Sequence, residues 1–328
     1  MRGFIFVIIL FLSATTFGQS LQTQKKVLKL MGCRFEVTAV ASNDTLAWEA
    51  IQGGIDEMER IEKLISSWDK NSQTSEINRQ AGIQPVKVDK ELFDLIVRAK
   101  KISFLTGGAF DISFASMDRI WKFDGSMKSM PDKSVVKNAA DKINWEDIIV
   151  SDKHQTIFLK RKNMKIGFGA IGKGYAANRA MQIMKKFDIA GGVVNASGDL
   201  ISWGKSENPN GWTIKIADPK DKNKILGILE TNDLAVVTSG DYEKFVTFEG
   251  QRYAHIIDPR TGYPTTGIKS VTVICPDAEV ADALATSVFV MGIGAGLKLI
   301  DHLKSVECII VTDDDEVLTS QRIKLENL

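Results

Sequence analysis

Residues 165–176, KIGFGAIGKGYA, hold four glycines within eight positions and separate two segments of different character. The run before them, TIFLKRKNMKI at 156–166, is compatible with a strand, and the residues after them have the pattern of a helix. Two phosphate-binding patterns match the spacing: G-x-G-x-x-G of dinucleotide-binding folds over 167–172, and G-x4-G-K of P-loops over 167–173. The fold therefore depends on the kind of turn that this stretch makes.

Neither nucleotide-binding pattern is complete. A dinucleotide fold needs an acidic residue about 20 positions after its glycines, at the end of the next parallel strand. Here the acid that follows the next strand, Asp199, comes 27 residues after Gly172, among segments that look antiparallel. A P-loop needs Ser or Thr after its lysine, and Gly174 stands there. A plain helix-starting turn is the third alternative, but Lys173 would oppose the helix dipole unless an anion also binds there.

The chain begins with MRGFIFVIILFLSATTFGQS, in which one arginine precedes nine apolar residues at 4–12. Nine residues are too few to span a bilayer, which takes about 20 in a helix. Thr16 and Gly18 stand at the −3 and −1 positions of a cleavage site, so we expect a signal peptide over 1–18 and a mature domain over 19–328. No cysteine lies at the cleavage point, so we expect a periplasmic protein without a lipid anchor.

Charge and metal-binding residue types narrow the function. Without Arg2 the mature chain has 41 basic and 41 acidic side chains, which gives no reason to propose a nucleic acid as partner. The three histidines have no metal-ligand spacing, so a zinc site is not expected. The three cysteines form no C-x-x-C motif, and we interpret them as small buried side chains.

Periodicity predicts helices and strands in separate parts of the chain. Apolar residues recur at spacings of three and four over 44–66, with Asp44 at the start, and over 90–106, 175–187, 277–292 and 295–303. Alternating segments between turn residues predict strands at 192–196, 212–217, 224–230, 234–239, 244–248, 253–257, 269–275, 306–312 and 316–320. We therefore predict an α+β fold, with mixed or antiparallel sheets and packed helices, in one interwoven domain or two subdomains.

Two oxygen donors share one helix face. Asp282 and Thr286 in ADALAT are four residues apart, so they lie one turn apart on a helix. A carboxylate and a hydroxyl suit a hard cation such as Mg²⁺. Taken alone, Thr286 could instead bond the carbonyl four residues earlier in its own helix.

Seven short motifs occur in the order typical of one family. They are MGC at 31–33, SSW at 66–68, GGAFD at 107–111, NASGD at 195–199, TSGDY at 238–242, HIIDPRTGYP at 255–264 and ADALAT at 281–286. With them the chain resembles the ApbE family of periplasmic flavin transferases, which use FAD and Mg²⁺. The resemblance implies a fold of two subdomains related to the T-fold, and it identifies 165–176 as the glycine element of that family.

The resemblance also implies roles for individual residues. The implied Mg²⁺ ligands are Asp282, Thr286 and the carbonyl of Ala170, where the glycines leave the backbone open to a metal and a pyrophosphate. The implied FAD contacts are Met31, Trp68, Ala109, Phe110, Asp111, Lys173 and Ile257. From their residue types alone, Met31 and Ile257 would be interpreted as core residues and Lys173 as a solvated lysine. The chain departs from the family where Gly167 replaces a usual Asp and Cys33 a common Thr.

His255 is the only histidine inside a motif. A neutral imidazole could accept the proton of an attacking hydroxyl, or it could only hydrogen-bond within its strand. The resemblance implies an FAD:protein FMN transferase, which attaches FMN to a Thr or Ser hydroxyl and releases AMP, acting on client flavoprotein subunits of membrane electron-transfer complexes. Two alternatives stay open: an FAD pyrophosphatase, in which water replaces the client hydroxyl, and a periplasmic flavin-binding protein without turnover.

Overall fold

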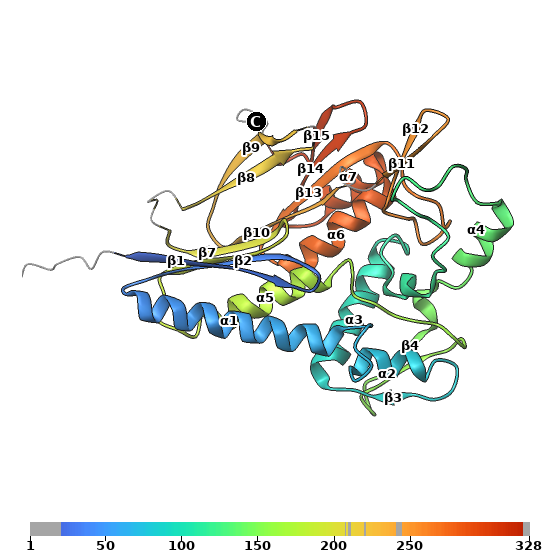
Figure 1. Ribbon diagram of the computed structural model, residues 1–328, viewed down its shortest axis with the longest axis horizontal. Coiled ribbons are helices and arrows are strands. Elements are labelled where there is room, and N and C mark those ends of the chain that lie inside the picture. Colours follow the sequence, from blue (N-terminus) through green and yellow to red (C-terminus); the bar gives the residue numbers. More distant parts are fainter. Residues whose placement is uncertain (1–20, 207, 209–210, 220, 241–244, 324–328) are drawn as a thin grey trace, which may run out of the picture.

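The structure is a computed structural model that describes residues 21–206, 208, 211–219, 221–240 and 245–323, so the expected signal peptide over 1–18 lies outside it. Its main sheet has eight strands, each antiparallel to its neighbours (Figure 1). Their spatial order is β1(Gln22–Leu30), β2(Cys33–Ala41), β6(Gly191–Ala196), β7(Asp199–Gly204), β10(Leu234–Gly240), β13(Ile268–Cys275), β14(Glu307–Thr312) and β15(Val317–Thr319).

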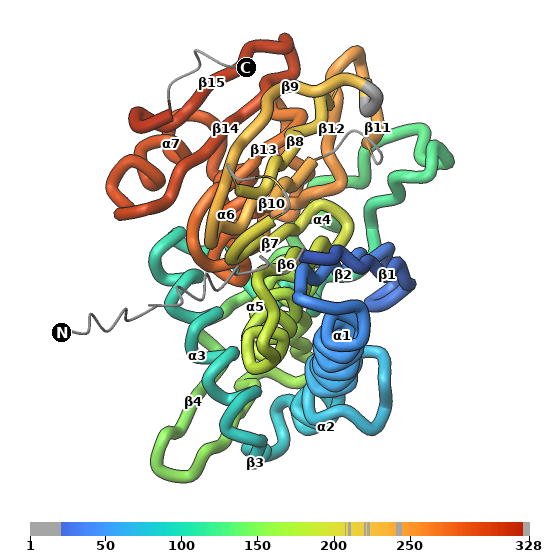
Figure 2. The backbone as a smooth tube through the Cα atoms, turned by 90° about the vertical axis from the view of Figure 1, so that its left-hand side faces the viewer, coloured from blue at the N-terminus to red at the C-terminus, as the bar shows by residue number. Residues whose placement is uncertain are grey.

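Three helices cover one face of this sheet, and a hairpin covers the other (Figures 1 and 2). The helices are α1(Asp44–Ile65), α5(Gly172–Met184) and α6(Ala278–Met291), with α7(Ile293–His302) next to α6 and β14. The hairpin is β8(Trp212–Asp218) and β9(Asp221–Thr231), and it buries Ile214 and Ile216 against Val236, Ile274 and Ile309 of the sheet. The sheet is therefore apolar on both faces at β7, β10, β13 and β14, whereas β1 and β2 carry Lys25, Arg34 and Glu36 on their outer face.

A second region, residues 67–166, lies between α1 and α5 in the chain. It contains α2(Gln73–Arg79), α3(Lys90–Leu105), α4(Lys133–Ala140), the small sheet β3(Val86–Lys87), β5(Thr156–Leu159) and β4(Ile148–Ser151), and 3₁₀ turns at Ile112–Ser116 and Trp145–Asp147. The hairpin β11(Phe245–Phe248) and β12(Gln251–Ala254) stands apart from the main sheet. One continuous cluster of buried apolar side chains joins this region to the main sheet and helices.

Helix α1 follows the predicted periodicity, but its cap differs from the prediction. Ile51, Met58 and Ile61 are buried, as expected from their spacing. The N-cap is Asn43 rather than Asp44, because the Asn43 side chain accepts the Leu46 N–H at 3.0 Å. Gly54 has a packing role, since a Cβ there would come 2.9 Å from Met184 of α5.

In the glycine-rich stretch of 165–176, residues 165–171 form a turn that leads directly into α5. The helix spans Gly172–Met184, so it begins and ends three residues earlier than predicted. Only the first four residues of the run at 156–166 form a strand, β5, and this strand pairs antiparallel in the small sheet. The glycines therefore do not join parallel strands, as a dinucleotide fold would require.

The fold class is confirmed: the described residues form an α+β structure with antiparallel sheets and packed helices. Each predicted strand segment contains a strand, although the one at 253–257 ends at Ala254 and continues as an isolated bridge between Ile257 and Pro264. Strands β1, β2, β3, β4 and β7 and helices α2 and α4 were not predicted. Helix α6 is buried on nearly every side, which accounts for its apolar sequence, and no described helix is long and apolar enough to cross a membrane.

Candidate active site

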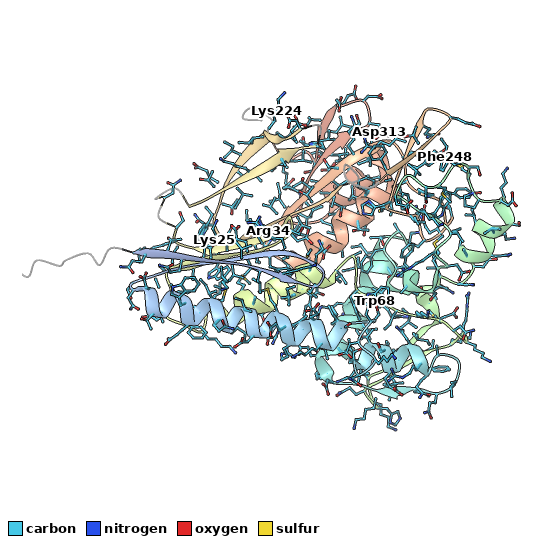
Figure 3. All side chains as sticks on the ribbon, in the orientation of Figure 1. Lys25, Arg34, Trp68, Lys224, Phe248 and Asp313 are labelled. Atoms are coloured by element: carbon cyan, nitrogen blue, oxygen red, sulfur yellow. The ribbon has the colours of Figure 1, made fainter. Side chains whose placement is uncertain are left out.

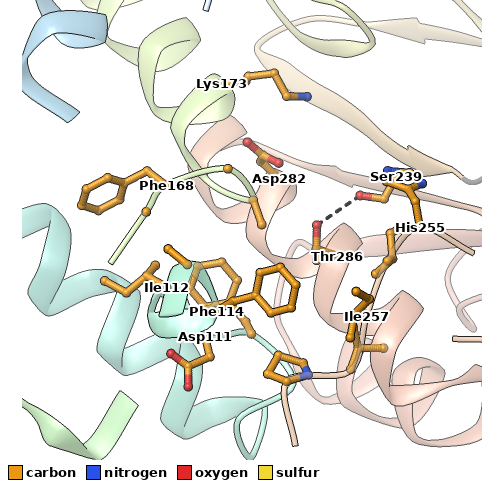
Figure 4. Close-up of a pocket in the computed structure, with 18 of the residues that line it drawn as sticks. Asp111, Ile112, Phe114, Phe168, Lys173, Ser239, His255, Ile257, Asp282 and Thr286 are labelled. Carbon is orange, nitrogen blue, oxygen red and sulfur yellow. Dashed lines mark hydrogen bonds between the residues drawn. The ribbon is translucent and has the colours of Figure 1, made fainter. Parts of the chain in front are cut away.

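A cavity of about 640 Å³ opens where the glycine turn, α6, the end of β10 and the loops after α1, α3 and β12 meet (Figure 4). Most residues expected from the sequence to form the site line this cavity. They are Trp68, Ala109, Phe110, Asp111, Ala170, Lys173, His255, Ile257, Asp282 and Thr286. They come from five separate parts of the chain, so the tertiary structure brings the motifs together.

Met31 does not line the cavity. It occupies the β1–β2 turn with a φ of 49°, and its N–H donates a 2.9 Å hydrogen bond to Glu62 Oε1. A Cβ on Gly172 would lie 4.0 Å from the Met31 Cε, so Met31 packs behind the helix start. Its expected contact with FAD stays a prediction.

A buried charge cluster forms one end of the cavity. The Lys173 ammonium donates a hydrogen bond to Asp199, which is 1% exposed, and the 3%-exposed Asp282 accepts the N–H of Gly174 at 3.0 Å. Burial and the charge of Asp282 raise the pKa of Asp199 to about 7, although Lys173 lowers it. Burial also raises the pKa of Asp282, an effect that Lys173 and the helix-start N–H groups oppose. Burial lowers the pKa of Lys173, but the two carboxylates outweigh this and raise it overall.

With both carboxylates ionised, this cluster has one positive and two negative charges, so a further cation would stabilise it. The donors around the cavity are a carboxylate (Asp282), a hydroxyl (Thr286) and, in the glycine turn, the backbone of Ala170. Oxygen donors of this kind fit Mg²⁺, which usually keeps several waters. Within the described residues, no three His, Cys, Asp or Glu side chains gather in a way that could hold a metal. The donor set therefore fits a hard cation shared with a bound phosphate.

Thr286 contacts the end of β10. Its hydroxyl lies 3.3 Å from the Ser239 hydroxyl, a bond that Figure 4 shows as a dashed line. In that view Thr286 lies between Asp282 and His255. The Thr286 hydroxyl thus faces the cavity from α6, one helical turn after the Asp282 carboxylate.

Asp111 lines the cavity, but protein groups occupy its carboxylate. Oδ1 accepts the N–H of Ser113 at 2.7 Å and Oδ2 accepts the N–H of Trp145 at 2.9 Å. Burial raises the pKa of this carboxyl, and the hydrogen bonds from Ser113 and Trp145 lower it. Asp111 therefore orders the 3₁₀ turn, and its expected contact with adenine or ribose stays a prediction.

The motif after His255 is a tight turn. Asp258 Oδ1 accepts the N–H of Arg260 at 2.9 Å, its carboxylate pairs with the Arg260 guanidinium at 2.8 Å, and its carbonyl accepts the N–H of Gly262 at 2.8 Å. Gly262 has a φ of 76°, which few other residues adopt. Asp258 thus has a turn-forming role, while His255 precedes the turn and lines the cavity.

Several lining residues were given no individual role by sequence reasoning, although some of them lie in the motifs. The apolar wall includes Ile112, Phe114 and Phe168, and the polar wall includes Ser197, Thr238 and Ser239. Asp199 was expected only as a member of the NASGD motif, although it is the partner of Lys173. That motif was the available signal: Asn195 accepts the Gly198 N–H at 2.9 Å, and this turn directs the chain to Asp199.

Of the two departures from the family pattern, Gly167 lines the cavity, and Cys33 lies close enough to Lys173 to interact with its charge. A Cβ on Gly167 would come 3.2 Å from the Ala115 Cβ, so a larger side chain needs that neighbour to shift. Cys33 is half-buried, and burial raises the pKa of its thiol although the charge of Lys173 lowers it. Neither residue is one of the proposed metal ligands.

Comparison with known proteins identifies one family. The model of the ApbE family matches residues 31–310. A protein named FAD:protein FMN transferase from Klebsiella pneumoniae (strain 342) is 29% identical over 303 residues, which cover 91% of this chain and 93% of that protein. A protein of the same name from Treponema pallidum (strain Nichols) is 29% identical over 281 residues, or 81% of this chain and 78% of that protein.

Solved structures share the fold. The crystal structure of an ApbE protein from Thermotoga maritima superposes with a TM-score of 0.82 at 30% identity, covering 92% of this chain and 97% of that one. The flavin transferase ApbE from Vibrio cholerae has a TM-score of 0.78 at 23% identity, covering 92% of this chain and 98% of that one. The second likeness concerns the fold alone.

Proposed function

This chain belongs to the ApbE family, and we propose that it transfers FMN from FAD to a threonine or serine hydroxyl of a client protein, with release of AMP. One observation carries the proposal: a single cavity joins an apolar aromatic wall to a polar wall that contains Lys173, Asp282 and Thr286, with His255 on the same cavity. The aromatic wall suits flat flavin or adenine rings. The polar wall suits a pyrophosphate.

Binding of the pyrophosphate is supported at the start of α5. Lys173 is the second residue of this helix, whose dipole favours an anion, although Asp282 already accepts the N–H of Gly174 there. The neighbouring carboxylates keep the ammonium charged, and its bond to Asp199 restricts its position. Lys173 would therefore present a positive charge in a fixed position to a phosphate.

We propose that Asp282, Thr286 and the carbonyl of Ala170 hold Mg²⁺, which when bound neutralises negative charge on the pyrophosphate. The Gly174 N–H already orients Asp282, and Ser239 contacts the Thr286 hydroxyl. Both side chains are thus ordered by the protein itself. Ordering of this kind lowers the cost of assembling the site.

The chemical step needs a proton acceptor for the client hydroxyl, and His255 is the candidate. The client oxygen forms a bond to the FMN-side phosphorus, the bond from that phosphorus to the AMP oxygen breaks, and the hydroxyl proton passes to the imidazole. AMP leaves as the second product. Positioning and charge neutralisation carry most of such phosphoryl transfers, and the base adds the proton transfer.

The direct test incubates the mature chain, residues 19–328, with FAD and Mg²⁺. It is done with and without a client subunit that has an acceptor threonine and carries no flavin. We expect covalent flavin fluorescence on the client together with stoichiometric AMP. A client whose acceptor threonine is replaced by valine is the matched control and should stay unlabelled. Rapid release of FMN and AMP without client would identify a pyrophosphatase, and tight FAD binding without any AMP would identify a binding protein.

We further propose that the chain is exported and cleaved after Gly18, and that its clients are subunits of membrane electron-transfer complexes exposed to the same compartment. The leader pattern at 1–18 supports export. Periplasmic protein should begin at Gln19 on N-terminal sequencing. A retained Met1, or a lipid-modified first residue, would contradict this.

A further inference from the structure

The segment 119–123, between the 3₁₀ turn at Ile112–Ser116 and α4, makes contacts at the cavity through three alternate side chains, two with lining residues and one with the turn that follows His255. The Arg119 guanidinium lies 5.1 Å from the ring centroid of Trp68. Trp121 donates a 2.8 Å hydrogen bond from Nε1 to the carbonyl of Gly262. The ring of Phe123 meets the imidazole of His255 edge to face, with centroids 6.4 Å apart and an angle of 78°. We call this segment the 119–123 strap.

From Trp121 onward the burial of the strap alternates, whereas Arg119 is exposed and Ile120 half-buried. Trp121 is buried and Phe123 half-buried, whereas Lys122 and Asp124 are exposed. Trp121 and Phe123, two residues apart, therefore face the protein, while Lys122 and Asp124 face solvent. In Figures 1 and 2 the chain that leads into α4 runs beside β11 and β12, the hairpin that ends just before His255.

Trp121 attaches the strap to the turn that follows His255. Besides its bond to Gly262, its ring lies 6.0 Å from that of Tyr263, and it is only 7% exposed. The chain on either side of this turn is paired, because Ala254 donates to the carbonyl of Thr265 at 2.9 Å and Thr265 donates to that of Ile256 at 2.9 Å. The backbone around His255 is therefore connected directly to the strap.

At the other end of the strap, Arg119 contacts Trp68. The Trp68 side chain is 80% exposed and is labelled in Figure 3 near the C-terminal end of α1. The strap thus touches two cavity-lining residues, Trp68 and His255, that lie far apart in the sequence. Trp121, between them, supplies the buried anchor.

We propose that Phe123 is a positioning residue that holds the imidazole of His255 for proton transfer, and that Trp121 anchors the strap in the place this requires. The inference rests on the proposed role of His255 as the proton acceptor. An edge-to-face contact restrains the ring without using either imidazole nitrogen, which leaves both nitrogens to hydrogen-bond. A base whose position is restrained transfers a proton more often in the reactive geometry.

The kinetic test compares Phe123→Leu, which keeps apolar volume but removes the ring, with Phe123→Tyr, which keeps the ring. Phe123→Leu should lower kcat for FMN transfer by roughly 2- to 12-fold, the range that the loss of one aromatic pair gives, with the KM for FAD changed less than about 2-fold. In Phe123→Tyr, kcat should stay within about 2-fold of the wild-type value. The matched control is Phe248→Leu, which removes a ring from the Phe248–Tyr253 pair of the neighbouring hairpin and should leave kcat unchanged.

A double-mutant cycle tests whether Phe123 acts through His255. In a His255→Asn background, Phe123→Leu should cause no further loss of kcat, because the group that it positions is absent. A multiplicative loss in the double variant, an unchanged kcat in a folded Phe123→Leu variant, or an equal loss in Phe248→Leu would each overturn the proposal.

A measurement without turnover separates this inference from the proposed function. The chain has three histidines, His154, His255 and His302, so their Hε1 proton resonances can be assigned with single His→Asn variants. Phe123→Leu should shift and broaden the His255 resonance and leave the other two unchanged. An unmoved His255 resonance refutes the positioning, whereas a shifted resonance together with normal transfer by His255→Asn would instead refute the proposed role of His255 as a base.

Discussion

The backbone N–H of Gly174 donates a 3.0 Å hydrogen bond to the carboxylate of Asp282, so the start of α5 holds the side chain with which α6 faces the cavity. A Cβ on residue 174 would lie only 2.1 Å from the carbonyl oxygen of Ala278 and 2.8 Å from the Cβ of Asp282. The two helices can therefore approach this closely only because residue 174 has no side chain.

The first prediction concerns this close approach. Gly174→Ala should lower the free energy of unfolding by about 3 kcal/mol, the upper part of the usual range for overpacking, because the opposing atoms belong to a buried backbone. Gly169→Ala, in the turn just before α5, is the control: its added Cβ meets no atom within 4 Å, so a change within about 0.5 kcal/mol is expected. Urea unfolding of both variants measures the difference. Equal stability of the two would contradict the packing argument.

The second prediction concerns the metal. Asp282→Asn keeps the side-chain shape but removes the only charged ligand proposed for Mg²⁺, so FAD turnover should fall at least about 100-fold, with the fold kept. Calorimetric titration with Mg²⁺ in the presence of FAD should show the binding lost. Ser287→Ala, whose hydroxyl bonds the Ala283 carbonyl on the same helix, should behave as the wild type. Turnover at the wild-type rate by a folded Asp282→Asn variant would exclude this site.

The third prediction uses the Lys173–Asp199 pair. The pKa of Asp199 is raised to about 7 from 3.8, so the folded chain binds this proton more tightly than the unfolded one. The contribution of Asp199 to stability is therefore full below about pH 4 and is lost as the pH rises through 7. Lys173→Met removes the positive charge that stabilises the ionised Asp199. The free energy of unfolding of this variant should therefore fall further below that of the wild type as the pH rises.

The size of that deficit follows from the geometry. Breaking a buried ion pair costs about 3–5 kcal/mol, and because the Lys173 side chain is 31% exposed, we expect about 3 kcal/mol at pH 8 and less at pH 5. Adding Asp199→Asn should recover most of it. Chemical unfolding in metal-free buffer at both pH values measures these differences, and a deficit independent of pH would argue against the buried carboxylate as its cause.

The fourth prediction concerns His255. If the imidazole accepts the proton of the client hydroxyl, His255→Asn should lower kcat by roughly 10²–10⁴-fold, with FAD affinity and thermal stability nearly unchanged. His154→Asn, an exposed histidine outside the cavity lining, controls for the loss of a histidine in general. Transfer rates, FAD binding and thermal unfolding on the same preparations give the answer. A stable, FAD-binding variant with normal transfer would remove His255 from the mechanism.

The sequence by itself determined those features that depend on neighbours along the chain. The spacing of Ile51, Met58 and Ile61 sufficed to predict α1, because a helix repeats every 3.6 residues. The same rule put Asp282 and Thr286 one turn apart on one helix face. The missing hydroxyl after Lys173 and the late acid Asp199 argue against both nucleotide folds through residue type and spacing alone.

Only the tertiary structure decided which of these residues meet. Gly174 and Asp282 are 108 residues apart and Lys173 and Asp199 are 26 apart, while Phe123 reaches His255 from another region of the chain. Periodicity describes how a segment presents its own faces, but the partner of each face depends on how helices and strands pack. For this reason Gly174 could be read as part of a turn, while the need for glycine there follows from the carbonyl of Ala278 on the opposing helix.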